Sequence, residues 1–167
     1  MINKVKNYNN KNEEQPVNSS VIKDVGIIGA GQMGGGIAQV SGENGFQVTL
    51  VDINDDILAK AIKAIEKRLE RQIEKGHCTR EQLEQTIKNI KPTTDYNNLG
   101  ICDLVIEAAT EEEEVKKTIF KNLVPYLNKK TLLATNTSSI SITRLAASTD
   151  RPEKFMGLHF MNPVPVM

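Results

Sequence analysis

The sequence GAGQMG at residues 29–34 follows directly on the apolar run VGII at residues 25–28. A G-x-G-x-x-G pattern between a strand and a helix is typical of the turn that binds the pyrophosphate of a dinucleotide. Gly29 permits the tight turn, Gly31 lets the backbone approach the pyrophosphate, and Gly34 lets the helix pack closely on the strand. The N–H groups at the helix N-terminus attract the phosphates. The predicted cofactor-binding residues of this turn are Gly29, Gly31, Gln32, Met33 and Gly34.

A second apolar run, QVTLV at residues 47–51, ends at Asp52, about twenty residues beyond the glycines, as a ribose-binding acid should. A carboxylate at this place accepts hydrogen bonds from the adenosine ribose and repels a 2′-phosphate. Residues 53–56, INDD, supply no Arg or Lys to neutralise such a phosphate, so the pattern favours NAD over NADP. The alternative is that Asp52 only caps the next helix, a role that suits Asn54 better.

The composition excludes several other classes of protein. The 167 residues suffice for one ordinary domain, and 21 Lys plus Arg balance 21 Asp plus Glu, so no basic surface for nucleic acid or an anionic membrane is expected. No apolar run approaches the roughly 18 residues that span a bilayer. Residues 1–20 are polar and Asn-rich and predict a disordered leader rather than a targeting peptide. Cys78 and Cys102 predict neither a disulfide framework nor a metal site, and reduced thiols favour a cytoplasmic protein.

Strand and helix patterns alternate along the rest of the chain. Continuous apolar strands are typical of a parallel sheet covered on both faces, and the alternation predicts an open, doubly wound α/β sheet of the Rossmann type. Two successive helices are longer than a minimal crossover and predict a helical hairpin that projects from the sheet. The predicted strands cover residues 25–28, 47–51, 91–94, 103–106, 131–135 and 155–160. The predicted helices cover residues 33–44, 55–75, 79–88 and 142–147, and a further helix ends near Val124. The apolar stripe of the 55–75 helix is Ile57, Ala61, Ile65, Leu69 and Ile73, and the helix that ends near Val124 buries Val115, Ile119 and Leu123.

Polar residues at the carboxyl ends of these strands are candidates for chemistry, because ligands bind there in such sheets. Glu111, the first of an acidic run, and Lys116 are predicted to reach the cofactor, and the alternative for both is a solvated helix start. The segment NTSS at 136–139 either caps a helix or presents a hydroxyl to a reacting oxygen. His159 is a candidate for the base that takes a hydroxyl proton, because an unperturbed imidazole has a pKa of about 6.5, although a His between Leu and Phe is often a core residue. His77 is predicted to be a surface residue.

Four segments in order resemble the 3-hydroxyacyl-CoA dehydrogenases, above all the bacterial 3-hydroxybutyryl-CoA type. They are GIIGAGQMGGGIAQ at 26–39, DLVIEAATE at 103–111, ATNTSSISIT at 134–143 and GLHFMNPVPVM at 157–167. The resemblance runs from about Val21 to the last residue and implies an NAD-binding Rossmann domain over 21–167. It implies NAD-dependent oxidation of (S)-3-hydroxyacyl-CoA to 3-oxoacyl-CoA in fatty acid and butanoate metabolism.

The same resemblance assigns roles to individual residues. It implies that His159 is the catalytic base, that the Ser138 hydroxyl lies near the 3-oxygen of the substrate, and that Asn162 is a substrate-binding residue of the same signature. The residues that the resemblance assigns to NAD are Gly29, Gly31, Gly34 and Asp52, with Glu111, Lys116 and Asn136 on the nicotinamide side.

One departure from the family pattern bears on activity. In the family a Glu about a dozen residues after the catalytic His orients the imidazole, and a helical domain forms a homodimer and completes the acyl-CoA site. This sequence ends at Met167, so we expect it to be the front part of such an enzyme, lacking that Glu and that domain. The alternatives are an NAD-binding module without catalysis and a dehydrogenase of hydroxy acids or sugar acids on the same fold.

Overall fold

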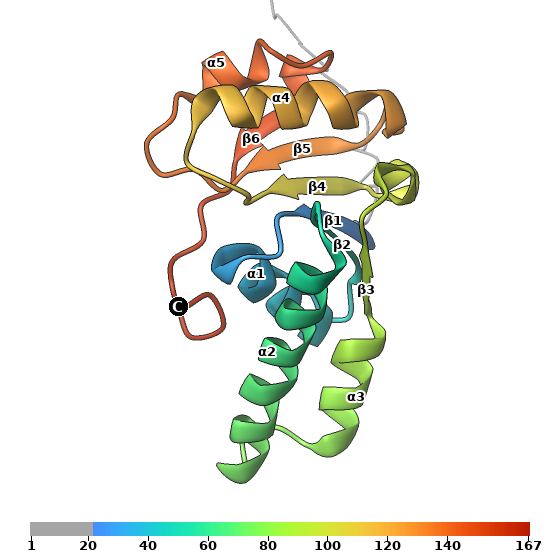
Figure 1. The fold of residues 1–167 in the computed structure, drawn as a ribbon, viewed down its shortest axis with the longest axis vertical. Helices are drawn as coiled ribbons and strands as arrows, with labels where there is room; N and C mark the ends of the chain where they lie inside the picture. The colour runs from blue at the N-terminus through green and yellow to red at the C-terminus, as the bar shows by residue number, and fades with distance from the viewer. Residues whose placement is uncertain (1–21) are drawn as a thin grey trace, which may run out of the picture.

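The structure, a computed structural model that describes residues 22–167, contains a sheet of six strands that all run parallel (Figure 1). The strand order is β3-β2-β1-β4-β5-β6, so the order reverses beside β1, as in a doubly wound sheet. This confirms the predicted fold class, while the predicted leader over residues 1–20 lies outside the described residues. The strands are β1 (Asp24–Ile28), β2 (Gln47–Val51), β3 (Ile90–Thr93), β4 (Leu104–Glu107), β5 (Leu132–Thr135) and β6 (Phe155–Gly157).

Helices cover both faces of the sheet. Figure 1 shows α1, α2 and α3 on one side and α4 and α5 on the other, and the far turns of α2 and α3 extend beyond the strands. Among residues 22–167, no helix has the length and apolar character that a membrane span requires. The helices are α1 (Gln32–Glu43), α2 (Asp55–Glu74), α3 (Arg80–Lys88), α4 (Glu113–Leu123) and α5 (Ile142–Ala146), with 3-10 turns η1 (Tyr96–Ile101), η2 (Val124–Tyr126) and η3 (Pro152–Lys154).

The central strands are buried on both faces because their side chains alternate between two cores. Ile27 of β1 packs in the cluster with α1, α2 and α3, while its neighbour Ile28 packs in the cluster with α4. Leu50 and Val51 of β2 divide in the same way. This period-two alternation explains why the strands are continuous apolar runs rather than alternating ones.

The helix ends follow their capping residues. The predicted buried stripe of α2 is confirmed at Ala61, Ile65 and Leu69 but not at its first residue, and the predicted buried face of α4 is displaced by one residue over its first two turns. Thr79 and Gln82 form the capping box of α3. In α2, Leu58 is 2 % exposed whereas Ile57 is 36 % exposed, so the buried stripe begins at Leu58. In α4 the buried residues are Lys116, Phe120 and Leu123, while Val115 is exposed. A rotation of one residue on a helix changes which side chain meets the sheet, and the apolar pattern alone fits either choice.

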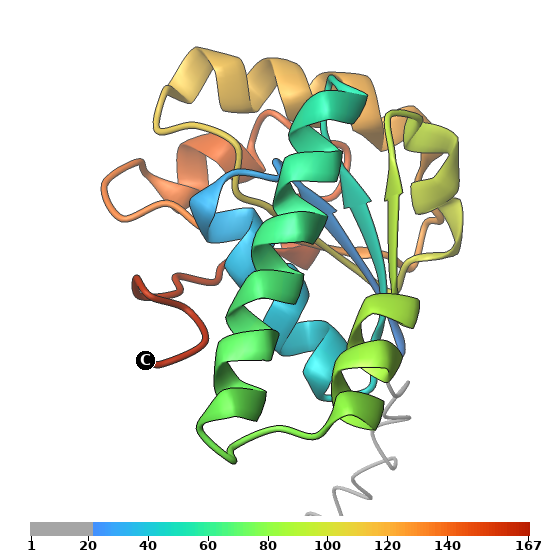
Figure 2. The same cartoon turned by 60° about the horizontal axis from the view of Figure 1, so that its bottom comes forward.

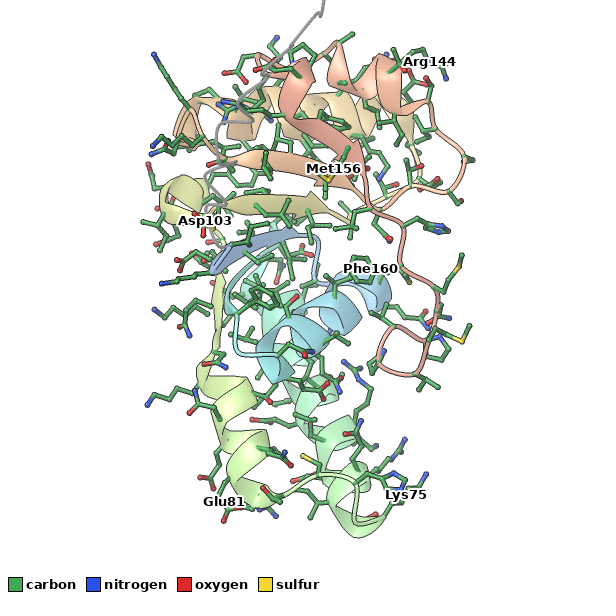
Figure 3. The ribbon with its side chains drawn as sticks, turned by 180° about the vertical axis from the view of Figure 1, so that it is seen from behind. Lys75, Glu81, Asp103, Arg144, Met156 and Phe160 are labelled. Carbon is green, nitrogen blue, oxygen red and sulfur yellow. The ribbon has the colours of Figure 1, made fainter. Side chains whose placement is uncertain are left out.

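The last strand is shorter than predicted. β6 ends at Gly157. The Leu158 N–H still donates to the Thr135 backbone oxygen at 3.0 Å. The Phe160 N–H, however, donates to the side-chain oxygen of Asn136 instead of to a backbone oxygen of the neighbouring strand. From there the chain leaves the sheet and turns back beside α1 (Figure 2). Val164, 9 % exposed, packs against Gly36 of α1, where an added Cβ would lie 2.9 Å from the Val164 Cβ. Phe160 lies on the side of this segment that faces α1 (Figure 3).

Candidate functional site

The glycine turn joins β1 to α1 where the strand order of the sheet reverses. Gly29 has a φ of 96°, in the left-handed region that glycine adopts most readily. A Cβ on Gly34 would lie 1.7 Å from the carbonyl oxygen of Gly29, so α1 can begin this close to the turn only with glycine there. At Gly31 a Cβ would meet nothing within 4 Å. The turn therefore has open space beside its backbone at Gly31.

The N-terminus of α1 faces this open space without a capping side chain. Gly31 is the N-cap residue, and the first turn of α1 contains no acidic residue. Its N–H groups and the positive end of the helix dipole therefore favour an anion. These features fit a pyrophosphate at residues 29–34.

Asp52 supports the turn from the end of β2. Its Oδ2 accepts a hydrogen bond from the Ala30 N–H at 2.7 Å, and its Oδ1 accepts one from the Ile53 N–H at 2.7 Å. The helix-capping alternative for Asp52 is wrong, because Asn54 caps α2 by accepting from the Asp56 N–H at 2.6 Å. Asp52 thus ties the second strand to the glycine turn.

A cavity of about 690 Å³ adjoins both Asp52 and the glycine turn. Large apolar side chains form its open walls: Ile53 is 89 % exposed and Val115 is 41 % exposed. Tyr96 also lines the cavity, and burial, together with the nearby charge of Asp52, raises the pKa of its phenol. The apolar cavity, the Asp52 carboxylate and the uncapped start of α1 lie next to one another. They would suit the base, the ribose and the pyrophosphate in turn. The site therefore fits the adenosine half of a dinucleotide.

Glu111 contacts the turn that carries Ser138. Its Oε1 accepts hydrogen bonds from the Thr137 hydroxyl, from the Ser138 N–H at 3.1 Å and from the Ser139 N–H and hydroxyl at 3.3 and 3.0 Å. Partial burial raises the pKa of Glu111, but the bonds from Thr137, Ser139 and the Ser138 backbone outweigh it and hold that pKa below its ordinary value. The predicted cofactor contact of Glu111 stays a prediction.

Lys116 lies under the site rather than on its surface. Its side chain is 1 % exposed, and its Nζ lies 2.6 Å from Oε2 of Glu107, which is fully buried at the end of β4. Glu107 also accepts hydrogen bonds from the Thr135 hydroxyl at 2.7 Å and the Ala109 N–H at 2.8 Å. This cluster joins β4, β5 and α4 below the carboxyl edge of the sheet. A direct contact of Lys116 with a cofactor stays a prediction.

The segment after β6 carries His159 to the same edge. Asn136 Oδ1 accepts from the Phe160 N–H at 2.7 Å, next to the bond from Leu158 to Thr135, so both neighbours of His159 are attached to the end of β5. Asn162 accepts from the Gln32 amide at 3.0 Å, which links this segment to the start of α1. His159 and Ser138 are exposed, and Met33 packs partly buried on the core.

The structure brings the predicted residues together at the carboxyl ends of five strands. The glycine turn follows β1, Asp52 follows β2, Glu111 follows β4, the 136–139 turn follows β5 and His159 follows β6. His77 is exposed, as predicted. The sequence reasoning missed Glu107 and Tyr96, and it named Thr137 only as one of the four polar residues 136–139. The sequence offered one signal for Glu107: a charged residue ends the apolar run of residues 104–107. A buried charge needs a partner, so this residue indicated a buried ion pair.

Comparisons with known proteins agree with this geometry. A family model described as "3-hydroxyacyl-CoA dehydrogenase, NAD binding domain" matches residues 24–167. The chain is 50 % identical over 149 residues to a 3-hydroxybutyryl-CoA dehydrogenase of Bradyrhizobium diazoefficiens, covering 89 % of this chain and 51 % of that protein. It is 43 % identical over 153 residues to the human mitochondrial hydroxyacyl-coenzyme A dehydrogenase, covering 88 % and 49 %. The chain thus spans about half the length of the curated relatives it matches.

Solved structures have the same fold. The crystal structure of an (S)-3-hydroxybutyryl-CoA dehydrogenase from Ralstonia eutropha aligns with a TM-score of 0.86 at 44 % identity, over 88 % of this chain and 52 % of that one. A lactate dehydrogenase from Eimeria maxima aligns with a TM-score of 0.59 at 13 % identity, which is a likeness of fold alone.

Proposed function

The chain belongs to the 3-hydroxyacyl-CoA dehydrogenase family, of which it contains the NAD-binding domain, and on that premise we propose that it serves the NAD-dependent oxidation of (S)-3-hydroxyacyl-CoA to 3-oxoacyl-CoA. The observation that carries the proposal is the open backbone at Gly31 beside Asp52, with His159 and Ser138 on the same edge of the sheet. Fatty acid and butanoate metabolism fit the relatives named above.

The residues of this chain divide the work between binding and proton transfer. The N–H groups at the start of α1 bind the pyrophosphate, and Asp52 accepts from the ribose hydroxyls. A bound NAD supplies the hydride acceptor that the oxidation needs. His159 takes the proton of the 3-hydroxyl as the C3 hydride leaves, and the Ser138 hydroxyl donates a hydrogen bond to the 3-oxygen. The exposure of both side chains supports their access to a substrate.

A second candidate is an NAD-binding module without catalysis. Within residues 22–167, the hydrogen bonds include none to the His159 imidazole, and an imidazole without an orienting acceptor is a poor base. The third alternative, a dehydrogenase of hydroxy acids or sugar acids, has less support, because the relatives at 42–50 % identity are named for hydroxyacyl-CoA substrates. Acyl-CoA as substrate is part of the same proposal, and a homodimer is proposed for the full-length members of the family. A cytoplasmic location is also proposed, because the thiols of Cys78 and Cys102 are free.

The test measures binding and turnover separately on this chain. Isothermal titration with NADH should show one site, with NADPH at least about tenfold weaker because Asp52 repels a 2′-phosphate. Turnover is followed as NADH absorbance with acetoacetyl-CoA, and His159→Ala should lower any rate at least about a hundredfold. NADH binding without turnover favours the module. No NADH binding by well-folded chain contradicts the proposal altogether.

A further inference from the structure

Two neighbouring glycines of α1 differ in what lies beside them. A Cβ added to Gly35 would make only ordinary contacts, with Ala30 O at 3.8 Å and Ala61 Cβ at 4.0 Å. A Cβ added to Gly36 would lie 2.9 Å from the Val164 Cβ and 3.0 Å from its Cγ2. Glycine inside a helix is less favourable than alanine, so the close approach of Val164 gives Gly36 its physical reason. The surface of α1 thus has a notch at Gly36, and Val164 occupies it.

Val164 is the main attachment of residues 161–167 to the rest of the fold. It is the one buried side chain among these residues, whereas Val166 is 80 % exposed. In the described part of the chain, one hydrogen bond joins residues 161–167 to another element, from the Gln32 amide to Asn162 at 3.0 Å, and both side chains are exposed. Burial of an aliphatic side chain is favourable, whereas a hydrogen bond between exposed groups contributes little.

The helix that carries the notch also begins at the glycine turn. Gly31 is the N-cap residue of α1, beside the open space that fits a pyrophosphate. His159 and Asn162 lie in the segment that leaves β6 and turns back beside α1 (Figure 2). This segment is attached to the end of β5 through the Phe160 N–H, and to α1 through Val164. One helix therefore holds both the turn and the far end of the segment.

We infer that Gly36 and Val164 are positioning residues, which attach the segment after β6 to α1 and so fix Asn162, and limit the movement of His159, relative to the glycine turn. The inference rests on the proposed function, because the segment carries His159, the proposed base, and Asn162, a predicted substrate contact. The attachment itself is an apolar contact within the chain and needs no bound ligand.

The experiment uses one added methyl group to probe the contact. Gly36→Ala places this group against Val164, and Val164→Gly removes both of the nearest atoms that it would meet. Gly35→Ala is the matched control, because the same substitution one residue earlier has room for its Cβ. Backbone NMR relaxation of the ligand-free chain should give Asn162 an order parameter of about 0.85 in the parent and in Gly35→Ala, and below about 0.6 in Gly36→Ala and Val164→Gly. Val164→Ala, which keeps the Cβ, should lie between them.

Hydrogen exchange separates a local release of the segment from a loss of general stability. Ile27 lies in β1 and is fully buried, so its amide exchanges through opening of the sheet. Its exchange rate should rise by less than about threefold in Gly36→Ala and Val164→Gly, because the notch lies outside the sheet.

Cofactor binding gives the measurement that concerns function. The NADH dissociation constant should stay within about threefold of the parent in every variant, because the residues of the glycine turn are unchanged. The chemical-shift changes that NADH induces at the His159 and Asn162 amides should fall by at least about half in Gly36→Ala and Val164→Gly, while that at Gly31 persists. A role in general stability would weaken all three signals alike.

Several results would overturn the inference. An Asn162 backbone that is mobile in the parent, or equally rigid in Gly36→Ala and Val164→Gly, would mean that the notch does not hold the segment. Exchange at Ile27 that quickens together with the mobility of Asn162 would mean a role in general stability. Unchanged NADH-induced shifts at His159 and Asn162 would mean that the contact does not position them. The relaxation measurement needs no ligand, so a parent chain that fails to bind NADH would reject the proposed function, and relaxation would still decide this inference.

Discussion

The three glycines of the GAGQMG turn are required for different physical reasons. Gly29 needs its positive φ, and an added Cβ there would lie 2.7 Å from the Ala109 Cα. Gly34 needs the close approach of α1 to the turn, whereas a Cβ on Gly31 would point into open space. Two of these positions are therefore constrained by the fold itself. The third is constrained only by what binds beside it.

This difference predicts that substitution by alanine affects stability at Gly34 and cofactor binding at Gly31. Gly34→Ala should lower the free energy of unfolding by about 3 kcal/mol, because its Cβ meets backbone that must move. Gly31→Ala should change that free energy by at most about 1 kcal/mol, since the backbone there suits any residue, but should weaken NADH binding at least about tenfold. Urea unfolding and isothermal titration measure the two quantities. Full NADH affinity in Gly31→Ala would contradict a pyrophosphate at this position.

Whether the role of a site residue could be predicted from the sequence depends on how far along the chain its partners lie. The glycine turn and Asp52 could be predicted, because their roles depend on a local strand-turn-helix pattern. The partners of Glu111 and Lys116 could not, since a run of charges at a helix start looks the same whether its members face solvent, a cofactor or a buried carboxylate. Only the pairing of β4 with β5 brings Glu111 to the 137–139 turn and the Thr135 hydroxyl to the Glu107–Lys116 pair.

At the level of elements, strands were easier to predict than helix faces. The order of apolar runs predicted all six strands within a few residues. The central strands β1, β2, β4 and β5 are buried on both faces, so their prediction needs no choice of which face is apolar. The first residue of the α2 stripe was wrong, the first two turns of the α4 face were displaced by one residue, and the end of β6 was placed too late. In each case the deciding contact is non-local: the cavity wall at Ile57, the buried pair at Lys116, and the Asn136 oxygen that takes over from the ladder.

The two helices on the α4 face are joined by an ion pair whose pH dependence can be predicted. Arg144 of α5 donates from Nε and Nη2 to the Glu113 carboxylate of α4 at 2.8 to 3.2 Å. Hydrogen bonds from Arg144, and then from Lys117, lower the pKa of Glu113 to about 2. A lowered carboxyl pKa means that the pair is intact above the ordinary Glu value and is lost as the pH falls toward 2.

We expect Arg144→Gln to raise the pKa of Glu113 toward the ordinary value, and Lys117→Gln to raise it less. An NMR titration of the Glu113 side-chain carbonyl between pH 1.5 and 7 measures both. The Glu113 side chain is 25 % exposed and that of Arg144 64 % exposed, so added salt should reduce the difference between parent and variant. A midpoint that does not change in Arg144→Gln would mean that the bridge is absent in solution.

At the scale of the whole molecule, two parts of the site are held in different ways: the part at the ends of β4 and β5 by the sheet, and the segment after β6 by side-chain contacts. The carboxyl edge of β4 and β5 is supported from below by the buried Glu107–Lys116 pair, and α4 packs over it. The segment after β6 is attached at three places instead: Asn136, the Gln32–Asn162 bond and the contact of Val164 with Gly36. His159 therefore depends on side-chain contacts, whereas the glycine turn depends on the sheet.

Removal of one partner of the buried pair should strongly lower the stability of the fold, because it leaves a buried charge without a partner at the junction of three elements. Lys116→Met removes the cation but leaves the Glu107 carboxylate fully buried, and breaking one side of such a pair costs about 3–5 kcal/mol. Glu107→Gln in the same chain should recover most of this loss, since a neutral amide still accepts from the Ala109 N–H and the Thr135 hydroxyl. Lys117→Met, one residue further along α4 and 30 % exposed, is the matched control and should cost at most about 0.5 kcal/mol. Urea unfolding of the four proteins decides the matter: a loss below about 1 kcal/mol in Lys116→Met would mean that water reaches Glu107 and that the sheet edge is not held by this pair.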